Sequence, residues 1–530
     1  MEQNTKNLIT KIPKEVSHVT KNLEEAGFDV FLVGGCVRDL LMGKEPKDWD
    51  LTTNATPEQI IPLFEKTVYE NNFGTVGVCV PRETKNSDFF HETELFSVSR
   101  GTNNHMNQNV THVTGESVPH ETSEYEIIEV TPYRTETKYS DFRHPDEVKF
   151  SDKLEDDLKR RDFTVNAMVM DSKGQVKDLY NGLTDIKDKV LRTVGEPDER
   201  FNEDALRMLR AVRFACQLGF SISHETSESI FKNSNLIKKI STERIRDEFS
   251  KIIMSRTPAL GVVMLHKFGL LKHIIPELEE GIGCVQGGAH IYDVWEHLLM
   301  ALQHAADKNW PFEIRFAALM HDIGKPRTRR PGEKKAYTFY GHEVVGARMA
   351  KKIMERLKYP NKETGLVETF VRMHMFFSDT EKITLSAVRR IIAKVGKENI
   401  WLLMNIRECD RVGMKKTEAP YRLRKYFAMI EEALRDPISV KQLKIDGSYM
   451  INMLHMKPGP RMGWMLNALL EEVLEDPTKN EIEYLKNKIL ELEKLEDKDL
   501  RELGEKGKEA KEELEEEEIE KLHAKHGVKK

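Results

Sequence analysis

The hydrophobic pattern of this chain changes along its length, and that change limits the possible folds more than any other feature. Up to about residue 175, short apolar runs typical of strands alternate with amphipathic stretches. Between residues 198 and 276 apolar residues recur with the 3.6-residue period of a helix, and a second helical region covers residues 291–436. The pattern therefore predicts an α/β domain followed by helical domains.

Local signals define the elements of the first domain. Strands are predicted at residues 28–33, 50–52, 126–131 and 165–170. Gly34 and Gly35 end the first strand, and an amphipathic helix is expected at residues 36–42. Another helix is expected to start at Thr56, where a capping threonine precedes Pro57. These elements predict a small sheet covered by helices.

Two segments differ from the rest in composition. Residues 81–124 are polar and contain few apolar positions, so we expect a long insertion without a packed core. Residues 476–530 contain 18 acidic and 13 basic residues, which accounts for most of the net charge of −6. We expect this end to form a solvated, charged helix or tail. Just before it, residues 457–460 predict a helix start bounded by prolines.

Composition also indicates the class of protein. Hydrophobic residues make up 39% and charged residues 32% of the 530 residues, as in globular proteins with a well-solvated surface. There is no run of the roughly 20 apolar residues that a membrane helix needs. Residues 1–15 lack the apolar core of a secretory signal, and the five cysteines show no CxxC spacing. We therefore expect a cytoplasmic protein with reduced thiols.

A glycine turn and two aspartates form the first group of candidate site residues. Gly34 and Gly35 separate a predicted strand from a predicted helix, where backbone N–H groups can hold a phosphate, and Arg38 lies in the first helical turn. Asp48 and Asp50 are two residues apart on a predicted strand, so their side chains point to the same face. Two adjacent carboxylates without a basic partner favour a pair of Mg²⁺ ions.

A charged helix expected at residues 203–214 offers a way to select a base. Asp204 and Arg207 would lie side by side on one face of this helix. The aspartate can accept from the amino group of cytosine or adenine, and the arginine can donate to the neighbouring ring nitrogen or carbonyl. Such a pair would select CTP and ATP without a template, while Arg210 and Arg213 would reach phosphates. A surface helix with an ordinary charge pattern is the alternative.

A second group of candidates combines histidines and aspartates in the helical region. Its members are His297, His321, Asp322 and Asp410, with His342 and His374 as further candidates. Neutral imidazoles and carboxylates on helices of one bundle can share one or two divalent ions. The pattern predicts a metal site that is separate from the aspartate pair.

The motif order resembles that of the class II tRNA nucleotidyltransferases and bacterial poly(A) polymerases. The resemblance rests on the glycine turn, the aspartate pair, the helix at residues 203–214 and the runs at residues 160–167 and 241–248. It implies a multidomain protein with an α/β polymerase-β-like head, an all-α neck, an HD helical domain and a C-terminal helical domain. The implied boundaries are 20–175 for the head, 176–280 for the neck, 281–415 for the HD domain, 416–475 for a helical tRNA-binding domain and 476–530 for the charged tail.

The resemblance also assigns roles to residues. Asp48 and Asp50 would be catalytic and bind Mg²⁺, with Glu129 as a candidate third carboxylate. The implied nucleotide contacts are Gly35, Arg38, Arg161, Asp204, Arg207, Arg210 and Arg213. The implied reaction is template-independent addition of C, C and A, from CTP and ATP, to the 3′ end of tRNA. One metal would activate the RNA 3′-hydroxyl, and the other would neutralise charge on the departing pyrophosphate.

Two segments bear on the choice between CCA addition and poly(A) tailing. Poly(A) polymerases of this class carry an arginine-rich run shortly after the metal pair, whereas residues 73–78 here contain no arginine. Members that add only CC lack a flexible loop, whereas residues 134–145 retain one. Both features favour full CCA addition, with poly(A) or A-only addition as alternatives.

The histidine and aspartate pattern resembles the HD phosphohydrolase superfamily, which also occurs fused to bacterial CCA-adding enzymes. That resemblance implies a divalent transition metal and cleavage of phosphomonoesters or 2′,3′-cyclic phosphodiesters. Two further readings remain open: a protein that acts mainly as a phosphatase or cyclic phosphodiesterase, and an RNA-binding protein with an idle site. The intact Asp48 and Asp50 pair argues against the idle site.

Overall fold

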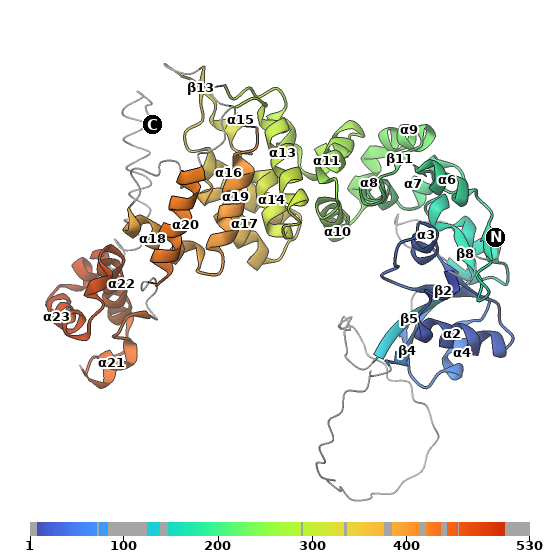
Figure 1. The fold of residues 1–530 in the computed structure, drawn as a ribbon, viewed down its shortest axis with the longest axis horizontal. Helices are drawn as coiled ribbons and strands as arrows, with labels where there is room; N and C mark the ends of the chain where they lie inside the picture. The colour runs from blue at the N-terminus through green and yellow to red at the C-terminus, as the bar shows by residue number, and fades with distance from the viewer. Residues whose placement is uncertain are drawn as a thin grey trace, which may run out of the picture. The chain divides into compact units, whose positions relative to one another are not determined.

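A computed structural model gives the fold of the chain (Figure 1). It describes residues 8–70, 74–82, 125–137, 147–287, 290–332, 336–375, 384–413, 420–435, 442–453 and 455–503. Nearly all of the predicted insertion, residues 138–145 of the predicted loop and the last part of the charged tail lie outside these residues. The chain divides into two compact units, Met1–Arg244 with Lys267–Leu270, and Ile245–His266 with Leu271–Lys530.

The first unit is built on a seven-stranded sheet in the order β3-β4-β5-β2-β1-β8-β9. Its strands are β1 (Val30–Val33), β2 (Asp50–Thr53), β3 (Thr67–Glu70), β4 (Thr75–Pro81), β5 (Tyr125–Pro132), β8 (Met168–Met170) and β9 (Val176–Asp178). β2 and β5 pair in parallel, whereas the other neighbours are antiparallel. The two parallel strands therefore run in the same direction, and Asp50 at the start of β2 pairs with Glu129 within β5.

The interior strand β1 is buried on both faces. Val30 and Leu32 point into one core cluster with residues of α2 (Lys14–Glu25), α3 (Gly35–Leu41) and α4 (Pro57–Ile60). Phe31 and Val33 point into a second cluster with residues of α5 (Leu154–Lys159). This alternation follows from the two-residue period of a strand, and a strand covered on both faces must be apolar throughout. The predicted strand and the helix after it are confirmed.

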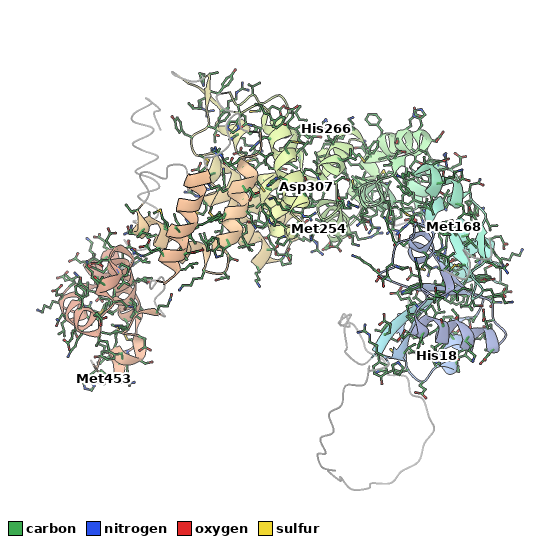
Figure 2. All side chains as sticks on the ribbon, in the orientation of Figure 1. His18, Met168, Met254, His266, Asp307 and Met453 are labelled. Carbon is green, nitrogen blue, oxygen red and sulfur yellow. The ribbon has the colours of Figure 1, made fainter. Side chains whose placement is uncertain are left out.

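One predicted strand is shorter than expected. Residues 165–170 were predicted to be extended, but a 3-10 turn occupies Thr164–Asn166 and β8 begins at Met168. Figure 2 labels Met168 among the side chains of the first unit. Thr164 donates a hydrogen bond to Asp185, and Asn166 donates one to Asp162. These side-chain bonds support a turn instead of a sheet ladder.

The remainder of the first unit is mainly helical, as the sequence predicted. Its further helices are α6 (Gly182–Asp188), α7 (Pro197–Glu203), α8 (Leu206–Leu218) and α9 (His224–Asn233). Short strand pairs accompany them: β6 (Arg134–Thr137) with β7 (Glu147–Phe150), and β10 (Val190–Leu191) with β11 (Ser221–Ile222). α10 (Thr242–Ile253) crosses from the first unit into the second.

The second unit is helical apart from one small hairpin among its described residues. The helices are α11 (Pro258–Lys267), α12 (Leu271–Ile274), α13 (Val294–Asp307), α14 (Phe312–Met320), α15 (Lys325–Thr328), α16 (His342–Arg356), α17 (Asn361–Met373), α18 (Leu385–Val395), α19 (Ile400–Asp410), α20 (Pro420–Arg435), α21 (Gly447–Asn452), α22 (Pro460–Glu475) and α23 (Ile482–Leu492). The hairpin joins β12 (Arg330–Pro331) and β13 (Tyr337–Thr338). No helix in the described part of the chain is long and apolar enough to cross a membrane.

The C-terminal helices correct one expectation. α22 starts at Pro460, as residues 457–460 predicted. The expectation that residues from 476 onward form a solvated extension is wrong for α23, because Leu485, Ile489 and Leu492 are buried in one core with residues of α22. This segment is highly charged overall, but its apolar residues recur with helical spacing and form one face. One such face is enough for a helix to pack against a core.

Candidate functional site

The predicted aspartate pair lies at the start of β2. Asp50 is the first residue of β2 and is half-buried, whereas Asp48 precedes the strand and is exposed. The parallel register places Glu129 of β5 directly opposite Asp50. Burial raises the pKa of Asp50 and the Asp48 carboxylate raises it further, while Arg161 opposes the shift. Three carboxylates from neighbouring positions thus gather where a bound cation would relieve their repulsion.

The glycine turn lies beside these acids and packs against an arginine. Gly34 caps α3 with a φ of 80°, a conformation that favours glycine. A Cβ atom at Gly34 would lie 3.1 Å from Nη1 of Arg161. Arg38, in the first turns of α3, donates from Nη1 to Oδ1 of Asn166 at 2.6 Å and from Nε to Asp39 at 2.9 Å. The turn therefore brings two arginines to the start of one helix.

Buried acids hold the arginines of the Arg-Arg-Asp run and of α8. Arg161 donates from Nη2 to Oδ2 of Asp157 at 3.0 Å. Arg210 forms two bonds to Oδ2 of Asp162, at 2.8 Å from Nε and 2.6 Å from Nη2. Arg213 lies over the ring of Phe214, 4.3 Å from its centroid. Each guanidinium has a partner that fixes its orientation, which reduces the entropy lost when it binds an anion.

Asp162 ties the stability of this site to pH. Burial alone would raise its pKa, but Arg210 and Asn166 lower it to about 2. An unfolded aspartate titrates near 3.8, so the charged carboxylate stabilises the folded head above that pH, and this contribution is lost as pH falls toward 2. We expect Asp162→Asn to reduce the free energy of unfolding at pH 7 by about 2 kcal/mol. Urea titrations of both proteins between pH 7 and 2 test this, because the difference should shrink below pH 4. A difference that is independent of pH would contradict it.

The predicted base-reading pair is arranged differently from the expectation of one continuous helix. α7 ends at Glu203 and α8 begins at Leu206, so Asp204 lies in the break, with an extended backbone at φ −142° and ψ 103°. Its Oδ1 accepts from the Leu206 amide at 3.0 Å, and its Oδ2 accepts from Arg244 at 2.7 Å. The break is stabilised by the Asp204 carboxylate, which binds the first amide of α8 and Arg244 while its backbone is extended.

Arg207 is likewise held by the protein. It is buried, donates to Glu203 at 2.5 Å, and reaches the carbonyl of Arg160 at 2.9 Å. The Arg207 amide donates to the Asp204 carbonyl at 3.0 Å, which joins the backbones of the pair. The two side chains are thus neighbours at a helix start, each oriented by a partner of its own.

Three partners in this site were missed by sequence reasoning. Asn166 lies within the predicted run at 160–167, but only its contact with Arg38 shows what it does. Asp157 precedes Arg160 and Arg161 by three and four residues, a spacing that could have suggested ion pairs on a helix. Arg244 lies 40 residues from Asp204, and no local signal links the two.

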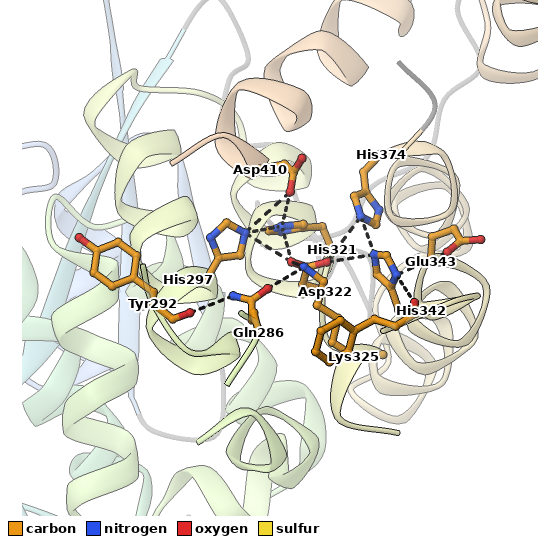
Figure 3. A network of polar contacts seen from close by, with 12 residues as sticks. Gln286, Tyr292, His297, His321, Asp322, Lys325, His342, Glu343, His374 and Asp410 are labelled. Carbon is orange, nitrogen blue, oxygen red and sulfur yellow. Dashed lines mark hydrogen bonds and ion pairs between the residues drawn. The ribbon is translucent and has the colours of Figure 1, made fainter. Parts of the chain in front are cut away.

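The second site gathers all six predicted metal ligands (Figure 3). A capping box of Asp293 and Glu296 starts α13 and so places His297 in its first turns. His321 and Asp322 directly follow the apolar helix α14 and are fully buried. His342 begins α16, His374 follows α17, and Asp410 ends α19.

A close helix contact brings two halves of this site together. A Cβ at Gly324 would lie 2.3 Å from the carbonyl oxygen of His342, so only glycine fits there. This contact lets the turn after α14 pack directly on the first turn of α16. Asp322 consequently reaches His342, with 3.2 Å between Oδ1 and Nε2.

The ligand atoms form two groups that share one carboxylate. Among the described residues, the groups with atoms within 4.8 Å of one another are His297, His321, Asp322 and Asp410, and Asp322, His342 and His374. Oδ2 of Asp322 lies 3.4 Å from Nε2 of both His297 and His321. Its Oδ1 is buried, lies 3.2 and 3.6 Å from Nε2 of His342 and His374, and has no hydrogen-bond partner among the described residues. The two oxygens of Asp322 are thus directed to different groups of ligands, so this carboxylate could bind two cations at once.

The histidine rings are oriented for metal binding. Nδ1 of each ring lies 2.7–3.1 Å from a backbone carbonyl, on Val412 for His297, Ala318 for His321, Phe339 for His342 and Val371 for His374. A carbonyl only accepts, so Nδ1 carries the proton and Nε2 faces the centre of the site. Nε2 of His297 and Nε2 of His321 are 3.0 Å apart. Two neutral rings cannot hydrogen-bond in this way, so a proton or a metal ion must separate them.

When no metal is bound, the pKa shifts of the two histidines assign this proton to His321. Burial lowers the pKa of His321, but Asp322 and Asp410 outweigh it and raise the pKa to about 10. Burial and the charge on His321 lower the pKa of His297 to about 3. Lys325 adds a further positive charge, since its Nζ contacts Asp322 and lies 2.7 Å from Gln286. The buried carboxylates therefore require cations, and the residues present fit metal ions.

Comparisons with protein families assign these regions. Residues 30–114 and 78–192 match the poly(A) polymerase head domain. Residues 219–282 match the probable RNA and SrmB-binding site of polymerase A, and residues 290–413 match the HD domain. The first match contains the aspartate pair and the Arg-Arg-Asp run, and the third contains all six candidate ligands of the second site.

Curated relatives and solved structures agree with the family models. The chain is 43% identical over 235 residues to a CCA-adding enzyme of Lactobacillus helveticus, which is 44% of this chain and 48% of the relative. It is 39% identical to one of Ligilactobacillus salivarius, over 48% of this chain and 54% of the relative. The chain thus spans about half the length of the curated relatives it matches.

The CCA-adding enzyme of Bacillus stearothermophilus in complex with CTP has a similar structure. Its TM-score is 0.62 at 25% identity, and the match covers 91% of this chain and 98% of that one. The Thermotoga maritima CCA-adding enzyme complexed with tRNA shares the fold, with a TM-score of 0.50 at 18% identity and coverage of 92% and 98%. On the three family models and these relatives, the chain combines a poly(A) polymerase head domain, the probable RNA-binding region of that polymerase and an HD domain, and it is similar to CCA-adding enzymes in sequence and fold.

Proposed function

We propose that this protein adds C, C and A to the 3′ end of tRNA, using CTP and ATP and releasing pyrophosphate. The observation that carries the proposal is the placement of Asp48, Asp50 and Glu129 at neighbouring positions around the start of β2, with Arg161 close to both Asp50 and the glycine turn. The named relatives are CCA-adding enzymes, and one of the similar structures contains CTP. Since tRNA is a cytoplasmic substrate and all five cysteines are unpaired, we place the protein in the cytoplasm.

The acids and the arginines of the head have separate roles in nucleotidyl transfer. Asp48 and Asp50, with Glu129, would hold Mg²⁺, which supplies charge neutralisation and activation of the RNA hydroxyl when bound. Arg38 and Arg161, on either side of the glycine turn, orient the triphosphate by their planar donors. No side-chain nucleophile is needed, because positioning and electrostatic stabilisation account for most phosphoryl-transfer catalysis.

Stepwise incorporation tests this proposal. Purified protein would receive tRNA that ends before the first C, after C, or after CC, with Mg²⁺ and each labelled triphosphate in turn. We expect C to be added to the first two substrates, A to the third, and synthesis to stop after A. Long A tails would assign the chain to poly(A) polymerases, and no incorporation with any substrate would refute the proposal.

Asp204 provides a sharper prediction about base choice. In Asp204→Asn the bond from the Leu206 amide to Oδ1 can persist, but Oδ2 becomes an amino group that donates instead of accepting and loses the bond from Arg244. We expect discrimination of CTP against UTP, as the ratio of kcat/KM values, to fall by about 100-fold, because a donor suits the uracil carbonyl. Asp198→Asn, in α7 and paired with Lys232, is the control that should keep the selectivity. Unchanged selectivity in Asp204→Asn would reject the base-reading role.

We further propose that the HD domain holds two divalent transition-metal ions and hydrolyses phosphomonoesters or cyclic phosphodiesters. The sharing of Asp322 between two ligand groups supports a pair of ions. Bound metal would supply a hydroxide at neutral pH and neutralise charge on the phosphate. Lys325, held by Gln286, keeps a positive charge beside Asp322, and the four backbone carbonyls hold the imidazoles in the ligating tautomer.

A further inference from the structure

Asp157 is a fully buried acid of the head that has no catalytic role in the mechanism above. It lies in α5, and its carboxylate accepts from two successive arginines. Oδ1 accepts from Nε and Nη2 of Arg160 at 2.9 and 2.5 Å. Oδ2 accepts from Nε and Nη2 of Arg161 at 3.3 and 3.0 Å. Burial would raise the pKa of Asp157, but the two arginines lower it, so the group stays charged.

The bond to Asp157 fixes which edge of Arg161 faces the nucleotide site. The Nε and Nη2 edge is directed to Asp157, whereas Nη1 lies against the glycine turn, 3.1 Å from the position of a Cβ on Gly34. Arg161 is also close enough to Asp50 to oppose the rise in its pKa. A planar guanidinium that is held along one edge presents its other edge in a fixed direction. Here that direction is the glycine turn at the start of α3.

Asp157 connects to two other parts of the site. Thr52, two residues after Asp50 on β2, has its hydroxyl 3.4 Å from Oδ2 of Asp157. Arg160, held by Oδ1, offers its backbone carbonyl to Nη2 of Arg207 at 2.9 Å. One carboxylate therefore contacts the metal-binding strand and both arginines of the Arg-Arg-Asp run, and through a carbonyl it reaches the base-reading arginine.

We propose that Asp157 is a positioning residue for nucleotide binding, which holds Arg161 so that its Nη1 edge faces the triphosphate at the glycine turn. The proposal rests on the proposed nucleotidyl transfer, because the triphosphate is its ligand. Asp157 acts through Arg161 and touches neither substrate nor metal. Its loss should therefore weaken CTP and ATP equally. Base choice should stay intact, because Arg207 is also held by Glu203 and by the carbonyl of Arg200.

The test is a double-mutant cycle in the full chain with Asp157→Asn and Arg161→Ala. We expect Asp157→Asn to raise KM for both CTP and ATP about tenfold while kcat stays within about threefold, because a lost ground-state contact appears in KM. In the Arg161→Ala background the same change should have no further effect on KM. Binding of CTP measured by calorimetry should weaken by the same factor as KM rises.

A structural role would give a different result. Asp185→Asn removes another buried acid of the head, paired with Thr164 and Arg192, and should lower the melting temperature without changing KM. An unchanged KM in Asp157→Asn, or a rise that persists in the Arg161→Ala background, would overturn the proposal. Asp157→Glu, which keeps the charge, replaces Asp157→Asn in the cycle if the latter does not fold. If the wild-type chain binds CTP but transfers no nucleotide, the proposed function fails, and calorimetry still tests Asp157.

Discussion

Asp50→Asn is expected to reduce nucleotide incorporation by about 1000-fold or more, and Asp48→Asn should have a similar effect. Asp50 starts β2 opposite Glu129, next to Asp48, and the burial of Asp50 makes its charge costly unless a cation is bound. Removing either charge weakens the cation site without removing the arginines that orient the triphosphate. The measurement is the single-turnover rate of CMP incorporation into tRNA that lacks CCA, at saturating CTP and Mg²⁺.

Two controls separate this effect from a loss of folding. Asp29→Asn changes an exposed acid at the opposite end of the same strand pair, because Val30 pairs with Thr53 and Leu32 with Leu51. This variant should incorporate CMP normally. Hydrolysis of a phosphomonoester by the HD domain should continue in Asp50→Asn if the two sites are independent. Incorporation by Asp50→Asn within tenfold of the wild type would show that the acid pair is not catalytic.

Asp322→Asn is expected to remove both metal ions from the HD domain and to lower phosphate-ester hydrolysis by about 1000-fold or more. Asp322 belongs to both ligand groups, and its two oxygens face different histidines. An asparagine carries no charge and offers one carbonyl oxygen, so it cannot bridge two cations. The measurement is the number of Mn²⁺ ions per chain after dialysis, together with hydrolysis of a phosphomonoester and a 2′,3′-cyclic phosphodiester.

The other ligands should distinguish the two ions. His374→Ala affects only the group of Asp322, His342 and His374, so we expect one ion per chain to remain. His304→Ala, on the same helix as His297 but paired with Glu408, is the control that should keep both ions. CCA addition should persist in all three variants. Two ions retained by Asp322→Asn would disprove the bridge.

Much of the head could be predicted from local patterns. The apolar run before Gly34 predicted β1, and the change to an amphipathic pattern predicted α3, because both depend on residues close in sequence. The threonine and proline at positions 56 and 57 marked the start of α4 for the same reason. Local signals failed to predict the secondary structure where side chains form hydrogen bonds with residues distant in sequence. The turn at Thr164–Asn166 replaced part of a predicted strand, and the Asp204 break replaced a continuous helix.

The sequence by itself determined the order of the domains and the candidate residues of both sites, because periodicity and motif spacing are properties of the chain. Only the tertiary structure decided how these residues meet. The parallel pairing of β2 and β5 brings Glu129 opposite Asp50, across 79 positions of chain. The close packing of Gly324 on α16 places Asp322 between two groups of metal-ligating residues. Asp157 binds one edge of the Arg161 guanidinium, and the other edge faces the glycine turn at Gly34, which is distant in sequence. Such contacts depend on helix packing and strand register, which join residues far apart in the sequence and leave no local pattern.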